Sequence, residues 1–225
     1  MKTASEKSRR GFLGTLALGA AAGTVSMFAN PLYANMSTFD ESQMDDVEKW
    51  FKKIKGKHRV VFDGSTPNEG FPVIWNWAFY LTNNGTGATD DQITAMTVFR
   101  HTAAGFAYED RIWKKYKLGE FFGINDNNTG KPALRNPYYE PKGKDFPIKG
   151  VDGIKRMQER GALFCICDLA TKVYSGFVAE NMGMDPQVAY EDWKSGILPD
   201  IKLVPAGIWA LERAQKHQCS YIFAG

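Results

Sequence analysis

The cysteine at position 167 is the residue of this chain best placed to do chemistry. It ends an apolar stretch typical of a β-strand and stands immediately before a predicted helix. A sulfur at this position lies near the free N–H groups of the helix N-terminus, which stabilise a thiolate. A cation from Arg100 or His101 would stabilise it further. Cys167 is therefore predicted to be a nucleophile or a sulfur carrier; the alternative is a thiol that packs as a small apolar side chain.

Other candidate residues follow the ends of predicted strands, where ligands bind in open parallel sheets. These residues are Asp63, Arg100, His101, Asp168 and Gly207. If the strands are neighbours, a carboxylate, an imidazole and a thiol converge on one edge of the sheet. We predict that His101 acts with Cys167 and that the other four contribute to binding. The alternatives are that Asp63 is a turn residue or a helix cap, and that a backbone carbonyl satisfies His101.

The roles of the other two cysteines, Cys165 and Cys219, stay open. Cys165 precedes Cys167 by two residues, so both side chains are expected on one face of the sheet, where a disulfide between them is geometrically poor. Together with His217 the cysteines could be written as four zinc ligands, but the two pairs fall at opposite edges of a parallel sheet. No metal is predicted, and no cofactor other than a persulfide on Cys167.

Short apolar runs alternate with helical patterns along the chain, which indicates parallel βαβ units. Strands are predicted at 59–63, 95–99, 162–167, 201–204 and 220–223, and helices at 40–55, 70–83, 104–116, 151–159, 169–182, 186–195 and 208–217. Residues 118–149 are rich in glycine and proline and are predicted to form a surface excursion. The predicted fold is a doubly wound α/β domain, with a mostly parallel five-stranded sheet flanked by helices.

The N-terminus matches a twin-arginine (Tat) export signal. Residues 8–13 read Ser-Arg-Arg-Gly-Phe-Leu, an uncharged apolar run continues to Phe28, and Ala34 is a small residue suited to cleavage. This pattern predicts recognition by the Tat machinery and a periplasmic or other extracytoplasmic location. Residues 1–34 would be the signal peptide and residues 35–225 a single domain. An uncleaved signal would tether the protein to the membrane.

The positive charge of the chain belongs to the predicted signal. Net charge is +3, but residues 1–34 hold 4 of the 28 Lys and Arg residues and 1 of the 25 Asp and Glu residues, which leaves 24 of each. A neutral domain has no electrostatic footprint for nucleic acid, so no nucleic-acid partner is predicted. The chain also lacks the GxGxxG, Walker A, HExxH and GxSxG motifs of nucleotide-binding proteins, zinc proteases and hydrolases.

The second half of the chain contains three short motifs. They are Gly-Ala-Leu-Phe-x-x-Cys at 161–167, Leu-Val-Pro-Ala-Gly-Ile at 203–208, and Gln-x-x-x-Cys-Ser-Tyr-Ile at 215–222. With these motifs the chain resembles the DsrE/DsrF-like family, best over residues 151–223. The resemblance implies a DsrE-like fold, a homo-oligomer, and a match of Cys167 to the family cysteine that holds sulfur as a persulfide in relay members. The chain departs from the family in being exported and longer, and in having Cys219 where glycine is frequent.

Two functions are compatible with these observations. In the first, Cys167 handles thiols or sulfur, exchanging it with a sulfur donor or acceptor while His101 stabilises the thiolate. In the second, the protein is a non-catalytic ligand-binding or interaction subunit of an exported or membrane-associated complex. The excursion at 118–149, with its segment Asn136-Pro137-Tyr138-Tyr139, would then form the contact surface.

Overall fold

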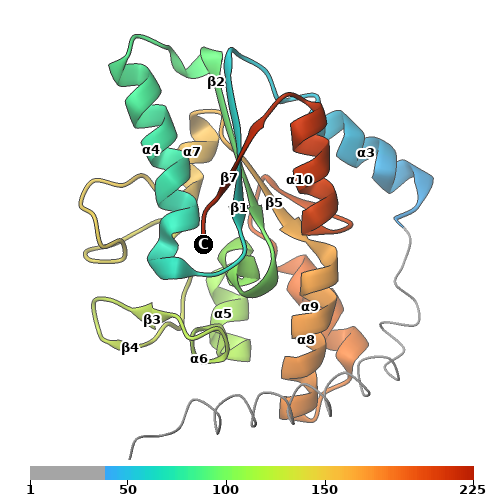
Figure 1. Ribbon diagram of the computed structural model, residues 1–225. Helices are drawn as coiled ribbons and strands as arrows, with labels where there is room; N and C mark the ends of the chain where they lie inside the picture. The colour runs from blue at the N-terminus through green and yellow to red at the C-terminus, as the bar shows by residue number, and fades with distance from the viewer. Residues whose placement is uncertain (1–38) are drawn as a thin grey trace, which may run out of the picture. The chain divides into compact units, whose positions relative to one another are not determined.

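A computed structural model describes residues 39–225 of the chain (Figure 1). The predicted Tat signal and its cleavage site lie outside the described residues. The main sheet consists of β1 (His58–Gly64), β2 (Ile93–Phe99), β5 (Leu163–Cys167), β6 (Ile201–Val204) and β7 (Ser220–Phe223). All five predicted strands are therefore confirmed, with ends that move by at most two residues.

The five strands are all parallel and lie in the order β6-β5-β2-β1-β7. The chain moves outward from β1 through β2 and β5 to β6, and then returns to the other side of β1 as β7. Strand order therefore reverses between β1 and β7. With helices on both faces, this is the doubly wound α/β fold predicted above.

Helices cover both faces of the sheet (Figure 1). One face carries α3 (Glu41–Phe51) and α10 (Gly207–Lys216); the other carries α4 (Phe71–Gly85), α5 (Asp110–Tyr116), α7 (Ile154–Glu159), α8 (Asp168–Met182) and α9 (Pro186–Ser195). The helix predicted at 104–116 is instead a 3₁₀ segment, η3 (His101–Ala107), followed by α5. In the described range 39–225, no helix is both long and apolar enough to cross a membrane.

Local sequence signals explain where these helices begin. Asp40 caps α3 through a capping box, in which its carboxylate accepts the Gln43 N–H while the Gln43 side chain accepts the Asp40 N–H. The Asp185 carboxylate caps α9 by accepting the N–H groups of Gln187 and Val188, and Pro186 occupies the first helical position, where its missing N–H has no cost. These caps place the buried stripe of each helix against the core.

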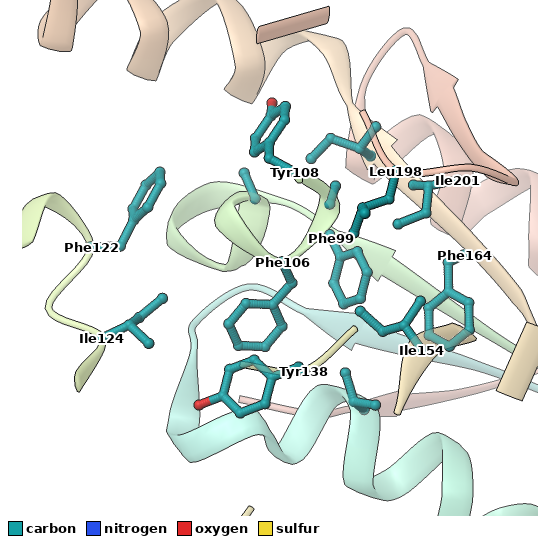
Figure 2. Packing of buried hydrophobic residues seen from close by; sticks show 14 of the residues in the cluster. Phe99, Phe106, Tyr108, Phe122, Ile124, Tyr138, Ile154, Phe164, Leu198 and Ile201 are labelled. Atoms are coloured by element: carbon teal, nitrogen blue, oxygen red, sulfur yellow. The ribbon is translucent and has the colours of Figure 1, made fainter. Parts of the chain in front are cut away.

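The core consists of two apolar clusters, one on each face of the sheet. The cluster on the α4 face is rich in aromatic side chains (Figure 2). In it Phe99 stacks on Phe164 with ring centroids 5.7 Å apart and meets Phe106 edge-on at 5.6 Å. Tyr138 packs on Phe106 at 4.4 Å. The last contact brings a residue of the predicted excursion into the core.

The excursion is anchored by buried residues, so its interpretation as a wholly surface segment was wrong. The side chain of Asn136 is buried; its amide nitrogen donates to the carbonyls of Phe106 (2.8 Å) and Tyr108 (2.9 Å), and its oxygen accepts the N–H of Tyr138 (3.0 Å). One side chain thus satisfies three backbone groups that would otherwise be buried without partners. Asn136 and Tyr138 therefore cannot supply the contact surface expected of them.

The rest of the excursion is short and local in structure. It contains α6 (Leu118–Phe121) and a small hairpin of β3 (Asn125–Asp126) and β4 (Lys131–Pro132). Asp145 is buried and accepts two hydrogen bonds from Arg135, at 2.7 and 2.8 Å. The short 3₁₀ segments η1 (Asn68–Gly70) and η2 (Asp90–Gln92) flank α4.

Candidate functional site

Three predicted site residues come together where adjacent strands end. Asp63 lies near the end of β1, Arg100 directly follows β2, and Cys167 is the last residue of β5. Because β1, β2 and β5 are neighbours, these residues share the carboxyl edge of the sheet. The reversal of strand order falls at β1 and β7, so Asp63 is at the switch point and Cys167 is two strands away from β1.

Asp63 and Arg100 form a bidentate ion pair. Arg100 Nε donates to Asp63 Oδ1 at 2.6 Å, and Arg100 Nη2 donates to Asp63 Oδ2 at 2.9 Å. The hydroxyl of Tyr221, on β7, donates to Asp63 Oδ2 at 2.8 Å. The carboxylate is buried, whereas the guanidinium is partly exposed. Asp63 therefore holds Arg100 in one orientation at the carboxyl edge of the sheet. Its role is not limited to forming a turn.

The sulfur of Cys167 lies at two helix N-termini. Cys167 is the N-cap of α8, and its Sγ accepts the N–H of Ala170 at 3.3 Å. Burial raises the pKa of the Cys167 thiol, and the N–H groups of Ala170 and Gly207 offset only part of this effect. The helix N-terminus is where the sequence predicted it, but the net direction of the pKa shift is upward, because desolvation outweighs the dipoles.

Arg100 is a cation that interacts electrostatically with this thiol. The hydrogen bond to Asp63 is the main cause of the raised pKa of Arg100; burial opposes it, and a thiolate at Cys167 would raise it further. The same attraction acts in the other direction, so the guanidinium favours the ionised form of Cys167. Gly207 makes this approach possible, because a Cβ at that position would lie 2.6 Å from Cβ of Arg100.

His101 lies at the same edge but is exposed. Its backbone φ is +48°, and its Nδ1 is 3.2 Å from the hydroxyl of Thr102. Its ring meets Tyr174 nearly at a right angle, with centroids 6.0 Å apart. Burial and then the charge of an ionised Cys167 raise the pKa of Tyr174. Tyr174 thus contacts His101 and interacts electrostatically with Cys167, and within residues 39–225 no hydrogen bond joins His101 to Cys167.

The side chain of Asp168 does not contact Asp63 or Arg100; its partners are Lys172 and Tyr190. Its carboxylate is buried, where it pairs with Lys172 Nζ at 2.7 Å and accepts the Tyr190 hydroxyl at 2.6 Å. Both partners belong to α8 and α9, so the side chain connects the two helices. The four-residue spacing of Asp168 and Lys172 is a helical ion-pair signal that was available in the sequence. The burial of this ion pair could not be predicted from the sequence, because it depends on how α9 packs against α8.

The two neighbouring cysteines occupy different faces. Cys165 packs in the cluster under α3 and α10, whereas Cys167 packs with the cluster on the α4 face. The prediction that they share one face was wrong, because β5 ends at Cys167 and the chain turns there into α8. Cys219 lies before the amino end of β7, across the sheet from Cys167. All three thiols are free and buried.

Comparisons with known proteins do not place this chain in a family: no family model, curated protein or solved structure matches it. The fold and the site define an α/β protein with a cysteine at the carboxyl edge of a parallel sheet. That cysteine lies between two helix N-termini and beside a guanidinium held by a carboxylate. This arrangement can bind and stabilise a negatively charged sulfur.

Proposed function

We propose that this protein is an exported DsrE/DsrF-like protein that carries sulfane sulfur as a persulfide on Cys167. The observation that supports this most is the position of the Cys167 sulfur between the N-termini of α8 and α10, next to Arg100. All of these groups favour negative charge at the sulfur. Arg100, rather than His101, is the cation with an electrostatic interaction with Cys167, so we assign it the stabilising role.

The loading step is a transfer between thiols and needs no external oxidant. The Cys167 thiolate attacks the outer sulfur of a donor persulfide, R–S–SH; a new S–S bond forms at Cys167 as the donor S–S bond breaks. The donor leaves as R–S⁻ and takes up the proton that Cys167 released. Transfer to an acceptor thiol is the reverse reaction with a different R group.

The raised pKa of Cys167 suits a carrier better than a constantly reactive thiol. Burial keeps the empty thiol protonated and slow to react. The added sulfur of a persulfide extends about 2 Å beyond Sγ, the length of an S–S bond. We propose that this terminal sulfur extends toward Arg100, whose guanidinium would stabilise its charge.

Intact mass spectrometry after treatment with polysulfide tests the proposal. We expect a gain of one sulfur atom on the native protein, removed by reductant and absent from Cys167→Ser. Cys165→Ala and Cys219→Ser are matched controls that should keep the gain. A native protein without the adduct, or an adduct that persists in Cys167→Ser, would refute sulfur carriage at this site. The same spectrum reports whether the chain is cut after Ala34, as Tat export predicts.

A second candidate is the non-catalytic subunit, and the edge strand β7 favours it. Tyr221, Ile222 and Phe223 are exposed on this strand, with Phe223 59% exposed. The outer edge of β7 has no partner strand in the described part of the chain. Antiparallel pairing with β7 of a second copy would satisfy both edges and form a homo-oligomer. The native mass of the wild-type protein and of Phe223→Lys tests this pairing of two copies: a monomeric wild type excludes the homo-oligomer.

A further inference from the structure

A cavity of about 800 Å³ lies beyond the carboxyl end of β1, between the loop that follows this strand and the excursion. Its volume falls in the range of roughly 300–1,000 Å³ common for small-molecule sites. Cys167, Arg100 and Gly207 are not among the residues that line it. The cavity is therefore a feature separate from the sulfur site proposed above.

Tyr138 supplies an unused polar group to this cavity. The residue is only 2% exposed, and its ring packs between Phe106 and Phe146. Its hydroxyl points away from the apolar cluster (Figure 2), and no group in residues 39–225 forms a hydrogen bond with it. The oxygen is not sealed in the core, so the hydroxyl is accessible from the cavity. Burial raises the pKa of Tyr138, and the negative charges of Asp145 and Glu69 add to the effect, so the hydroxyl keeps its proton and can donate a hydrogen bond to a ligand.

The wall opposite the excursion is a strained loop. Asn68, Glu69 and Gly70 have consecutive positive φ angles of 36°, 51° and 87°. Gly70 cannot be replaced easily, because a Cβ there would lie 2.6 Å from the ring of Tyr138. Strained backbone of this kind persists where the surrounding structure over-determines it, frequently beside ligands. The absence of a side chain at Gly70 therefore allows this loop to pack against the Tyr138 ring.

The charges around the cavity favour an anion. Lys144 and Lys149 line it, and neither forms an ion pair within residues 39–225, whereas Glu69 is the one carboxylate in the lining. Asp145 also acts on Tyr138, but its charge is balanced by the ion pair with Arg135. Phe122 and Phe146 contribute apolar, flat walls. A ligand that satisfies all of these groups has a flat apolar body and an anionic end.

We propose that this cavity binds a small aromatic carboxylate, whose ring packs on Phe122 and Phe146. Its carboxylate accepts a hydrogen bond from the Tyr138 hydroxyl and is neutralised by Lys144 and Lys149. The site is independent of sulfur chemistry at Cys167.

A protein-observed NMR titration of the full chain with benzoate tests the assignment. We expect saturable shifts at the side-chain amides of Asn125 and Asn127, and much weaker shifts with benzamide, which has the same shape without the charge. Tyr138→Phe keeps the packed ring and should weaken benzoate binding roughly threefold to tenfold, the effect of losing one hydrogen bond.

Charge variants and a cysteine variant complete the test. The double variant Lys144→Gln, Lys149→Gln should weaken benzoate binding by about tenfold, whereas Lys57→Gln, at the opposite edge of the sheet, should not. Benzoate binding should persist in Cys167→Ser. A failure of the cavity proposal can therefore be distinguished from a failure of the sulfur proposal. Absence of saturable shifts, equal binding of benzamide, or unchanged affinity in Tyr138→Phe would each overturn the proposal.

Discussion

Gly207 lies directly against the side chain of Arg100. A Cβ built on Gly207 would be 2.6 Å from Cβ and 2.9 Å from Cδ of Arg100. These distances are too short for any pair of carbon atoms that are not bonded. The missing side chain at the start of α10 therefore allows the arginine that follows β2 to pass close to Cys167.

Gly207→Ala should displace Arg100 and destabilise the fold by about 1–3 kcal/mol, the usual cost of overpacking. It should also weaken any stabilisation of a thiolate or persulfide at Cys167. Urea unfolding measures the first effect. Gly85→Ala is the matched control, because a Cβ there meets nothing within 4 Å; it should leave stability unchanged or raise it slightly. Equal stability of the two variants would contradict the steric explanation.

Alkylation of Cys167 should be slow at neutral pH and accelerate about tenfold per pH unit up to pH 9, because burial raises its pKa and only the thiolate reacts. The double variant Asp63→Asn, Arg100→Gln removes the cation without leaving a buried, unpaired carboxylate. We expect it to slow alkylation at a given pH roughly threefold to tenfold. Iodoacetamide labelling followed by peptide mass spectrometry measures the rate. An unchanged rate would show that Arg100 does not influence the thiol.

Asn136→Ala should cost about 2–4 kcal/mol, because it leaves two carbonyls and one N–H buried without hydrogen bonds. The matched control is Asn125→Ala on the exposed hairpin, which should change stability by less than about 0.5 kcal/mol. Chemical denaturation of both variants provides the comparison. A small effect at Asn136 would mean that ordered water replaces its amide.

Asp192 should contribute to the loss of stability in acid. Burial opposes its ionisation, yet hydrogen bonds from Lys115, Tyr116 and Arg111 lower its pKa from 3.8 to about 2. A depressed pKa stabilises the folded state above pH 3.8, and this contribution disappears as the pH falls toward 2. Because Arg111 and Lys115 are 44% and 45% exposed, solvent screens the interaction, and the contribution of Asp192 amounts to no more than about 1 kcal/mol. Unfolding of Asp192→Asn between pH 2 and 5 should show a flatter pH dependence than the wild type.

The fold could be predicted from the sequence because its signals are local. Apolar runs such as residues 201–204, and the caps at Asp40 and Asp185, determine strands and helices over a few neighbouring residues. Parallel topology then follows from the alternation of strands and helices. The same reasoning predicts Asp63, Arg100 and Cys167 at one edge of the sheet, where they lie.

The parts that could not be predicted depend on contacts between residues far apart in the chain. Tyr221 meets Asp63 only because β7 returns beside β1, and Tyr174 borders His101 only because of how α8 packs. Residues 118–149 show no periodicity from which their burial could be predicted. The amide of Asn136 anchors them to the carbonyls of Phe106 and Tyr108, which are distant in the sequence. Likewise, the pKa direction of Cys167 is a balance of burial against dipoles, and a sequence does not show burial.

The separation of Cys165 and Cys167 onto two faces limits what oxidation can do to this protein. Two neighbouring cysteines can form a disulfide on oxidation, but here the end of β5 would have to bend to bring Cys165 and Cys167 together. Cys219 lies at the opposite edge of the sheet. Within residues 39–225, Cys167 therefore has no cysteine beside it that could resolve an oxidised sulfur. A persulfide or mixed disulfide formed at Cys167 would have to be released by a thiol supplied from another molecule.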